Sequence, residues 1–341
     1  MRIALLGGSF DPIHAGHLEI AKTALKKLAI DEVWFLVAKD SPLKDGQQVS
    51  FQHRYQMVKN ACRPYRHFKA CGIENERTGK SYTIDTILML KKRYPMHTFS
   101  FIIGDDQAVH FHLWRSSEQL LQECAFYVVS RFVDCQIDER MHRLQMDLVD
   151  VSSTEIRQGK KMYYLCKSNM RYISQHGLYV TSRVQQCMKP SRFDHSQRVA
   201  DVCVALAKAH GLDTEKAYRM GIMHDVTKHM PLSFHENVLK YCMPQHLNAP
   251  VPIMHGYTGA WYAQKVLKEE DQEVIQAIYH HVLGDGKGIY DQVLFIADKI
   301  EPGRNYDTSK QMALSLKSIK LGFEYVKLEN EAYLQKEGVI E

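Results

Sequence analysis

The sequence has little of what marks a secreted, membrane or disulfide-stabilised protein. Its eight cysteines form no C-x-x-C pair, which argues against a zinc ribbon and makes reduced thiols the simpler interpretation. No apolar run approaches the length of a membrane span, and the run in MRIALLGG is too short for a signal peptide. We therefore expect a cytoplasmic protein with no membrane partner.

Low-complexity segments and Gly-X-Y repeats are also absent, and no charge of one sign dominates. The net charge is +5, with basic and acidic residues interspersed, which suits anionic small molecules as well as nucleic acid and decides little between them. No nucleic-acid partner is expected. A hydrophobic content of 45% supports ordinary buried cores, and 341 residues are comfortable for two domains. These values leave the oligomeric state open, a homo-oligomer included.

The two halves of the chain differ in their pattern. In the first half, short apolar β-rich runs alternate with amphipathic segments of helical spacing, such as 18–29 and 83–94. The β-rich runs lie at 2–6, 32–38, 97–103 and 125–130. This alternation predicts a Rossmann-like α/β domain with a parallel sheet, helices on both faces, and ligands at the carboxyl ends of the strands.

From about Val184 onward the pattern is helical throughout. Helical segments lie at 198–212, 215–229, 257–270, 273–281 and 290–300, with glycine and proline between them. No second set of alternating strands is visible. We therefore expect an all-α helical bundle, with the boundary near 181–190 and the two domains at 1–183 and 188–341.

The stretch GGSFDPIHAGH at residues 7–17 carries the first chemical signal. Gly7 and Gly8 end a strand and precede a helix expected near Ala15, so that a phosphate can approach the backbone N–H groups closely. His14 and His17 are three residues apart and can face the same side of that helix. The stretch matches neither the P-loop nor the G-x-G-x-x-G pattern. The alternative interpretation is a tight turn whose histidines merely pack.

Further motifs follow this stretch in the first half of the chain, and together they indicate a protein family. GGSFDPIHAGHL resembles the signature of the H-x-G-H nucleotidyltransferases. There follow, in order, SYTIDT at 81–86, FIIGDDQ at 101–107, Trp114, VVSR at 128–131, VSSTEIR at 151–157 and NMRYISQHGLY at 169–179. Together they resemble the bacterial nicotinate-nucleotide adenylyltransferases over nearly all of residues 1–180. The resemblance implies transfer of AMP from ATP, bound with Mg²⁺, to nicotinic acid mononucleotide, which gives deamido-NAD and pyrophosphate in NAD biosynthesis.

The same resemblance implies roles for individual residues. His14 and His17 are the implied catalytic residues, which contact the triphosphate and stabilise charge at the attacked α-phosphorus. Substrate contacts are implied for Gly7, Gly8, Ser9, Phe10, Lys44, Tyr82, Thr83, Asp106, Trp114, Arg131, Ser153, Thr154 and Arg157. Tyr82, Thr83 and Trp114 are expected around the nicotinate ring. Taken alone, Trp114 also fits a core position and Lys44 a solvated loop. The chain departs from the family pattern at Leu43 and Asp105.

The second half carries a separate set of candidate metal ligands. They are His195, the doublet His224-Asp225, His255, His281 and Asp298, all within about a hundred residues. Adjacent residues of a helix point about 100° apart, so the doublet can reach an ion from one edge while its carboxylate bridges to a second ion. Imidazole and carboxylate ligands without thiolate favour iron or manganese over structural zinc.

The motifs RFDHSQRV, IMHDVTK, HGYTGA, HHVLG and FIADKIEPGR resemble those of the HD-domain metal phosphohydrolases. The similarity covers about 188–330, and its wording is closest to the symmetrical diadenosine tetraphosphatases, or bis(5'-nucleosyl)-tetraphosphatases. It implies a metal quartet of His195, His224, Asp225 and Asp298, with His255 and His281 binding either a second ion or the substrate phosphates. It also implies phosphate contacts for Lys228 and Arg304, with Asp225 and Lys228 catalytic, and it leaves His280 on the helix face.

The implied second reaction is metal-assisted hydrolysis of diadenosine tetraphosphate to two ADP, through attack of an activated water on an internal phosphorus. One or two transition-metal ions would be the cofactors, iron first and manganese second. Two alternatives stay open for the HD half, which either acts on another nucleotide phosphate ester or senses nucleotides without turnover. For the first half, the alternative acceptor is nicotinamide mononucleotide.

Overall fold

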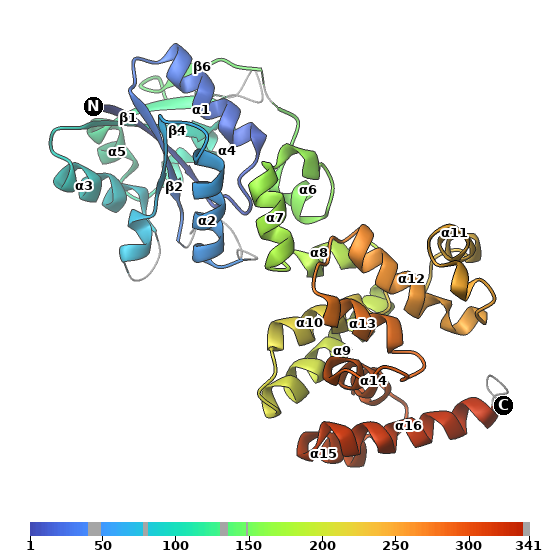
Figure 1. Cartoon of the computed structure of the whole chain (residues 1–341). Coiled ribbons are helices and arrows are strands. Elements are labelled where there is room, and N and C mark those ends of the chain that lie inside the picture. Colours follow the sequence, from blue (N-terminus) through green and yellow to red (C-terminus); the bar gives the residue numbers. More distant parts are fainter. Residues whose placement is uncertain (40–48, 78–80, 130–135, 148, 337–341) are drawn as a thin grey trace. The chain divides into compact units, whose positions relative to one another are not determined.

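The protein divides into two compact units, Met1–Ile173 and Ser174–Glu341, in the computed structural model (Figure 1). The structure describes residues 1–39, 49–77, 81–129, 136–147 and 149–336. None of the helices in this described part is both long enough and apolar enough to cross a membrane. Each unit is treated by itself below.

The first unit is built on one six-stranded sheet in which every neighbouring pair is parallel. Its strands are β1 (Arg2–Gly8), β2 (Glu32–Val37), β3 (Phe68–Cys71), β4 (Thr98–Gly104), β5 (Ala125–Val129) and β6 (His142–Leu144). Their order is β3-β2-β1-β4-β5-β6, so the direction of strand addition reverses between β1 and β4. In doubly wound sheets, ligands bind at the carboxyl ends of the strands at this reversal.

Helices cover both faces of the sheet. They are α1 (Ala15–Lys27), α2 (Phe51–Cys62), η1 (Ile73–Glu76), α3 (Thr83–Arg93), α4 (Asp105–Val109), η2 (Phe111–Leu113), α5 (Ser117–Glu123), α6 (Ser153–Arg157), η3 (Met162–Tyr164) and α7 (Lys167–Gln175), whose last residues belong to the second unit. Figure 1 shows α3 and α5 on one side of the sheet and α1 and α2 on the other. Ile84, Ile87 and Leu90 recur every three residues on α3 and are buried against Ile3 and Leu5 of β1. This confirms the predicted parallel α/β architecture.

Two edge strands were not predicted from the sequence. β3 has four residues and β6 has three, and both lie at the ends of the sheet order. Segments this short carry too few residues to show an alternation of apolar and polar side chains. Only their pairing with β2 and β5 identifies them as strands.

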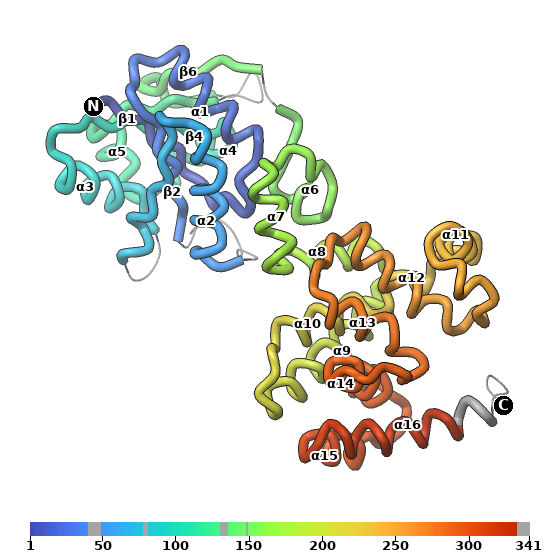
Figure 2. The backbone as a smooth tube through the Cα atoms, in the orientation of Figure 1, coloured from blue at the N-terminus to red at the C-terminus, as the bar shows by residue number. Residues whose placement is uncertain are grey.

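The second unit contains helices only, within the part of it that the structure describes (Figure 2). They are α8 (Val180–Gln185), α9 (Pro190–Ala209), α10 (Thr214–Met223), α11 (Leu232–Cys242), η4 (Pro244–His246), α12 (Val251–Lys265), α13 (Gln272–His280), α14 (Ile289–Ile300), α15 (Ser309–Lys317) and α16 (Ile319–Lys336). Helix α14 contacts α9, α10, α13 and α16 and is almost wholly buried, as expected for a helix that is apolar on most sides. The predicted all-α bundle is confirmed.

A glycine allows two of these helices to approach closely. A Cβ at residue 221 on α10 would lie 2.5 Å from the backbone Cα of Ala200 on α9, too close for any side chain. The two helices therefore pack backbone against backbone. His224 directly follows α10 and His195 lies on α9, so this close packing brings two candidate ligands together.

Candidate functional sites

A cavity of about 710 Å³ opens in the first unit at the carboxyl ends of the strands. Gly7 and Gly8 of β1 line it together with Gly104 of β4, which places it at the reversal of strand order. The predicted residues that line it are Gly7, Gly8, Ser9, His14, His17, Tyr82, Thr83, Asp106, Trp114, Ser153, Thr154 and Arg157. The structure therefore brings twelve residues from distant parts of the chain to one cavity.

Three of the expected substrate contacts are not seen in the cavity wall. Lys44 and Arg131 lie outside the described residues, as does the departure at Leu43. Phe10 does not line the cavity, because its ring is 1% exposed and packs edge-on against His17, with ring centroids 5.1 Å apart. The side chain of Asp105 is also buried, and its carboxylate accepts a hydrogen bond from the backbone N–H of Asp106 at 2.9 Å.

The two histidines of the H-x-G-H motif lie side by side at the start of α1. Their ring centroids are 3.8 Å apart, and His14 is the residue immediately before the helix. His17 Nδ1 accepts a hydrogen bond from the backbone N–H of His14 at 3.2 Å, so the neutral ring carries its proton on Nε2. The motif thus presents an N–H donor beside a second imidazole at a helix N-terminus that lines the cavity.

Glycines in this motif are required by space. A Cβ at residue 16 would lie 3.1 Å from His14 Nδ1 and 3.3 Å from a methyl group of Val151. A Cβ at residue 7 would lie 2.8 Å from the Phe101 ring, closer than side chains approach one another. These glycines therefore keep the histidine pair and the strand ends closely packed, beside any role in admitting a phosphate.

Helix α6 is tied to the loop between β1 and α1. Ser152 is the N-cap of this helix and forms a capping box with Glu155. The Ser152 hydroxyl accepts a hydrogen bond from the Glu155 N–H at 3.2 Å, and the Glu155 carboxylate accepts one from the Ser152 N–H at 3.0 Å. Ser153 donates to the Pro12 carbonyl at 2.9 Å, and Arg157 donates to the Asp11 carbonyl at 2.8 Å. The loop that carries the histidines is thereby held against a second polar, cationic segment.

The cavity wall also contains aromatic side chains and a cation, Arg115, that the sequence did not predict. The Trp114 ring packs against Phe111 with centroids 5.2 Å apart. The Arg115 guanidinium lies over the Tyr82 ring, 4.9 Å from its centroid, and pairs with Asp85 at 3.5 Å. Both Trp114 and Arg115 line the cavity. In the sequence, the one sign of a role for Arg115 was its position directly after Trp114, a predicted site residue.

A buried arginine that the sequence analysis did not identify holds together the strand ends beside the cavity. The Arg54 side chain on α2 is fully buried and donates to the carbonyls of Ser9 and Ala38, both at 2.7 Å, and of Lys39 at 3.2 Å. Ser9 follows β1 and Ala38 follows β2, so one guanidinium joins the ends of both strands. An arginine in an amphipathic helical segment gives no sign of this in the sequence.

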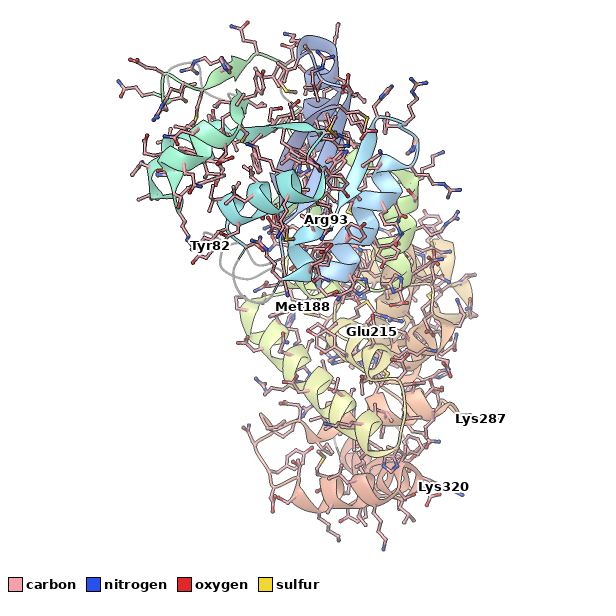
Figure 3. The ribbon with its side chains drawn as sticks, turned by 90° about the vertical axis from the view of Figure 1, so that its left-hand side faces the viewer. Tyr82, Arg93, Met188, Glu215, Lys287 and Lys320 are labelled. Carbon is pink, nitrogen blue, oxygen red and sulfur yellow. The ribbon has the colours of Figure 1, made fainter. Side chains whose placement is uncertain are left out.

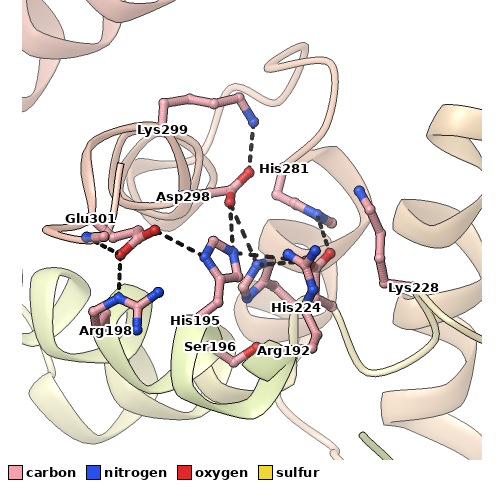
Figure 4. Close-up of polar contacts among 12 residues, drawn as sticks. Arg192, His195, Ser196, Arg198, His224, Lys228, His281, Asp298, Lys299 and Glu301 are labelled. Carbon is pink, nitrogen blue, oxygen red and sulfur yellow. Dashed lines mark hydrogen bonds and ion pairs between the residues drawn. The ribbon is translucent and has the colours of Figure 1, made fainter. Parts of the chain in front are cut away.

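In the second unit, the six candidate ligands converge on one buried cluster. Figure 4 labels four of them, His195, His224, His281 and Asp298. They come from five places: His195 from α9, His224 and Asp225 from directly after α10, His255 from α12, His281 from directly after α13, and Asp298 from α14. Their ligand atoms fall into groups of three within 4.8 Å of one another. His280 stays outside the cluster, where it pairs with Asp285 at 2.7 Å.

Asp225 is at the centre of the cluster. Its Oδ2 lies 3.5 Å from His224 Nε2 and 3.8 Å from His195 Nε2, whereas its Oδ1 lies 3.3 Å from His255 Nε2 and 3.7 Å from His281 Nε2. Asp298 Oδ1 lies 3.2 Å from His195 Nε2 on the first side. The two carboxylate oxygens of Asp225 therefore face two separate groups of imidazoles, the geometry of a bridging ligand.

The cluster has the chemistry of a divalent cation site. His224 Nδ1 lies 2.7 Å from the Gly221 carbonyl and His281 Nδ1 lies 2.6 Å from the Ile278 carbonyl, so both rings carry the proton on Nδ1 and turn the Nε2 lone pair inward. Among the described residues, the buried atoms His195 Nε2, His224 Nε2 and Asp225 Oδ1 have no hydrogen-bond partner. These mixed imidazole and carboxylate groups of three, which include no thiolate, suit a divalent cation.

Electrostatics agree with this assignment. Burial disfavours a charge on Asp225, but the imidazoles around it, His224 first, hold its pKa well below the ordinary value. Burial likewise opposes a charge on Asp298, while Lys299 and His195 hold its pKa well below that of a free carboxyl. Burial lowers the pKa of His255, which keeps the ring neutral and able to bind a cation. In contrast, Asp225 and Asp298 raise the pKa of His224 to about 9 against the effect of its burial. The centre thus pairs two ionised carboxylates with one imidazole that favours its charged form and with His255 in its neutral form.

Four cations surround the cluster. Arg192 Nη1 lies 3.0 Å from Asp225 Oδ2, Lys228 Nζ lies 2.9 Å from His255 Nε2, and Lys299 and Arg304 contact the two oxygens of Asp298 at 2.7 and 3.0 Å. Lys228 and Arg304 were predicted as phosphate contacts, whereas Arg192 and Lys299 were not. Burial lowers the pKa of Lys228. Arg192 lies three residues before His195 in RFDH, which is the signal that was available.

Two known protein families match separate parts of the chain, one around each candidate site. The Cytidylyltransferase-like family matches residues 5–159, and the HD domain family matches residues 192–303. A nicotinate-nucleotide adenylyltransferase of Exiguobacterium sibiricum is 42% identical over 189 residues, which are 53% of this chain and all of that protein.

Other relatives extend over more of the chain or over the second unit. A Mycoplasma pneumoniae protein named nicotinate-nucleotide adenylyltransferase/Ap4A hydrolase is 26% identical over 333 residues, which are 94% of this chain and 96% of that one. A crystal structure from Clostridium acetobutylicum, described as an HD superfamily hydrolase involved in NAD metabolism, is 24% identical, with a TM-score of 0.43. It covers 48% of this chain and 88% of its own.

Proposed function

The chain belongs to the nicotinate-nucleotide adenylyltransferase family and carries an HD domain, and from this premise we propose that it is a bifunctional nucleotide enzyme. The first active domain is proposed at 1–183 and the second at 188–341. Each carries its own site, and the two sites suit different chemistry: one positions phosphates with imidazoles and an arginine, and the other holds a divalent cation.

The first domain transfers AMP from ATP to nicotinic acid mononucleotide. A phosphate oxygen of the acceptor forms a bond to the α-phosphorus of ATP, and the bond between the α- and β-phosphates breaks to release pyrophosphate. This needs positioning and charge stabilisation rather than a covalent enzyme intermediate. The observation that carries the proposal is a cavity whose wall combines the His14–His17 pair and Arg157 with the aromatic side chains of Tyr82 and Trp114.

Individual roles follow from these positions. The Nε2–H of His17 and the imidazole of His14 contact the phosphates around the α-phosphorus and stabilise the charge that develops there. Ser153, Thr154 and Arg157 contact the β- and γ-phosphates, which carry Mg²⁺. Tyr82, Thr83 and Trp114 enclose the nicotinate ring, because aromatic faces suit a flat heteroaromatic ring. Lys44 and Arg131, outside the described residues, remain proposed substrate contacts.

The test is dinucleotide formation by the full-length protein with ATP, Mg²⁺ and either nicotinic acid mononucleotide or nicotinamide mononucleotide. We expect deamido-NAD from the acid acceptor at a higher kcat/KM than NAD from the amide acceptor. Equal values would contradict the proposed acceptor. No dinucleotide from either acceptor would contradict the adenylyltransferase assignment itself.

The second domain hydrolyses diadenosine tetraphosphate to two ADP. The observation that carries this proposal is the cluster of four imidazoles and two carboxylates surrounded by four cations. His195, His224, Asp225 and Asp298 hold a first ion, and His255 and His281 hold a second ion or contact phosphate. A bound iron or manganese ion would supply an activated water and neutralise charge on phosphate oxygens. Arg192, Lys228 and Arg304 provide positive charge for a chain of four phosphates.

The intact ligand set favours turnover over nucleotide sensing. Six candidate ligands, two of them histidines whose Nδ1 atoms are oriented by backbone carbonyls, exceed what a binding module needs. The test is product analysis with diadenosine tetraphosphate in the presence of Mn²⁺ or Fe²⁺, where two ADP are expected. ATP plus AMP would contradict symmetrical cleavage, and a metal-loaded protein without activity would contradict the hydrolase assignment.

The proposed location is the cytoplasm, where ATP and dinucleotides are made and thiols stay reduced. All seven cysteines in the described part of the chain are free, and three of the most buried, Cys62, Cys124 and Cys203, have their pKa raised by burial. Such thiols are poorly reactive, which suits a reducing compartment.

A further inference from the structure

The turn that follows α14, residues 301–304, lies against the metal cluster although Glu301 is not among its six candidate ligands. Glu301 is only 2% exposed. Burying a carboxylate is costly unless it is paired and hydrogen-bonded, so its position calls for partners.

Glu301 has partners on both oxygens. Its Oε1 lies 3.2 Å from Nδ1 of His195, and its Oε2 accepts from Arg198 Nε at 2.5 Å and from the backbone N–H of Gly303 at 2.6 Å (Figure 4). His195 Nε2 points to the other side of the ring, 3.2 Å from Asp298 Oδ1. Glu301 therefore lies behind one metal ligand.

This arrangement distinguishes His195 from two other histidines of the cluster. His224 and His281 each direct Nδ1 at a neutral backbone carbonyl, of Gly221 and Ile278 respectively. His195 directs Nδ1 at a carboxylate, which is a stronger acceptor. An ionised acceptor behind a metal-binding imidazole fixes its tautomer and raises the basicity of the nitrogen that faces the metal.

The glycine at residue 303 leaves the space that the Arg198 side chain occupies beside Glu301. A Cβ at residue 303 would lie 2.5 Å from Arg198 Nη2 and 2.6 Å from Arg198 Nε. Glycine at this position therefore lets the guanidinium reach the carboxylate. Arg198 and His195 lie three residues apart on α9 and share a face, so one helix supplies both the metal ligand and the residue that secures its support.

We propose that Glu301 is a positioning residue of the metal centre. It holds the Nδ1–H tautomer and the orientation of His195, and Arg198 and Gly303 hold Glu301 in turn, so that the quartet binds a divalent cation more tightly. The inference rests on the proposed function only in requiring that the cluster binds a metal ion. It does not depend on which nucleotide is hydrolysed.

The test is the affinity of the full-length protein for Mn²⁺, measured by competition with a chromophoric chelator. Glu301→Gln keeps the size of the side chain and removes its charge, and we expect Mn²⁺ affinity to fall by about 10-fold or more, within the range of about 10–100-fold typical of such partners. The electron paramagnetic resonance spectrum of bound Mn²⁺ should change as well, because the ring orientation of one ligand is released.

Glu269→Gln is the matched control. Glu269 is a second buried carboxylate of the same unit, which accepts from Arg219 Nε at 2.9 Å and from the backbone N–H groups of Glu270 and Asp271. Its environment thus copies that of Glu301 without the metal-cluster histidine. We expect its Mn²⁺ affinity and spectrum to match those of the unsubstituted protein.

Gly303→Ala provides an independent variant that keeps the Glu301 carboxylate but displaces Arg198. A weakening of Mn²⁺ binding in Glu301→Gln and Gly303→Ala, with Glu269→Gln unchanged, supports the proposal. Unchanged Mn²⁺ affinity in a folded Glu301→Gln variant overturns it, as does an equal loss in Glu269→Gln. If the unsubstituted protein binds no Mn²⁺ or Fe²⁺, the metal centre and the proposed hydrolase both fall, which is a different result.

Discussion

At the scale of single residues, the role of Arg115 in the wall of the adenylyltransferase cavity follows from its neighbours. Arg115 lies over Tyr82 and follows Trp114 directly, and within the described residues it forms an ion pair with Asp85. A flat ring held between these aromatic groups would bring a ring substituent near the guanidinium. A carboxylate there forms a hydrogen-bonded ion pair with the guanidinium, whereas the carbonyl of a neutral carboxamide accepts a weaker hydrogen bond without a second charge.

We expect Arg115→Gln to lower the preference for nicotinic acid mononucleotide over nicotinamide mononucleotide by about 10- to 100-fold, since a hydrogen bond to a charged group contributes about 1.5–3 kcal/mol. The measurement is kcat/KM for both acceptors, with the KM for ATP unchanged. Arg93→Gln is the control, because Arg93 forms an exposed ion pair with Glu76 and does not line the cavity. Figure 3 labels Arg93 and Tyr82. An unchanged preference would remove Arg115 from acceptor selection.

Gly16 supports a second residue-scale prediction. Gly16→Ala adds a Cβ 3.1 Å from His14 Nδ1 and displaces that ring by a few tenths of an ångström, while alanine favours the helix by about 1 kcal/mol. We therefore expect adenylyl transfer to fall by about 10-fold, because reaction rates are sensitive to small misplacements of catalytic groups. Urea unfolding should show a stability within about 1 kcal/mol of the unsubstituted protein. Unchanged activity would mean that the His14 ring position is not critical.

Several residue assignments were accessible from the sequence because a local motif carries them. His14, His17 and the His224-Asp225 doublet stand in short patterns whose residue types already limit the chemistry. Arg54, Arg115 and Glu301 were not accessible, because their roles arise from contacts with segments far away in the chain. Phe10 was assigned to the substrate from its motif, but the tertiary structure turns its ring into the core beneath His17.

At the scale of elements, α2 contributes to the site through Arg54. Its guanidinium joins the ends of β1 and β2 by donating to Ser9 and Ala38. Parallel strands end at the same edge of a sheet but are otherwise free to diverge there. A single buried donor with several N–H groups therefore keeps the loop after β1 in register with the loop after β2.

We expect Arg54→Met to destabilise the first unit by several kcal/mol, since each buried carbonyl left without a donor costs about 1–3 kcal/mol. The KM for ATP should rise in whatever fraction stays folded, because the Ser9 loop is released. Thermal unfolding and ATP titration measure the two effects. Arg63→Met, at the exposed end of the same helix, is the control and should change neither. Retention of full stability would show that the carbonyls find other donors.

At the scale of the whole molecule, the two sites lie in different compact units and use different chemistry. His17→Ala removes a donor from the developing charge and should lower adenylyl transfer by about 100-fold or more while leaving hydrolysis intact. Asp225→Asn should do the reverse, because it removes the carboxylate that bridges both groups of imidazoles. Steady-state assays of both activities on each variant test this. Loss of both activities in one folded variant would contradict two independent sites.

Selective chelation should separate the activities without any substitution. Imidazole ligands favour iron or manganese, whereas Mg²⁺ prefers oxygen ligands such as the phosphates of ATP. A chelator with aromatic nitrogen donors, added in the presence of Mg²⁺, is therefore expected to abolish hydrolysis and spare adenylyl transfer. Mn²⁺ should restore the hydrolysis. Equal loss of both activities, with Mg²⁺ in excess, would mean that the first site also needs a transition metal.

The sequence by itself determined the fold class and predicted the two domains and the candidate reactive side chains, because periodicity and short motifs are local properties of a chain. The tertiary structure decided which of those side chains share a cavity, that β3 and β6 complete the sheet, and that Asp225 lies between two groups of imidazoles. It also revealed the supporting residues Arg54 and Glu301, which act on carbonyls and an imidazole supplied by other elements. Such contacts depend on distances between segments, which no local pattern of residues encodes.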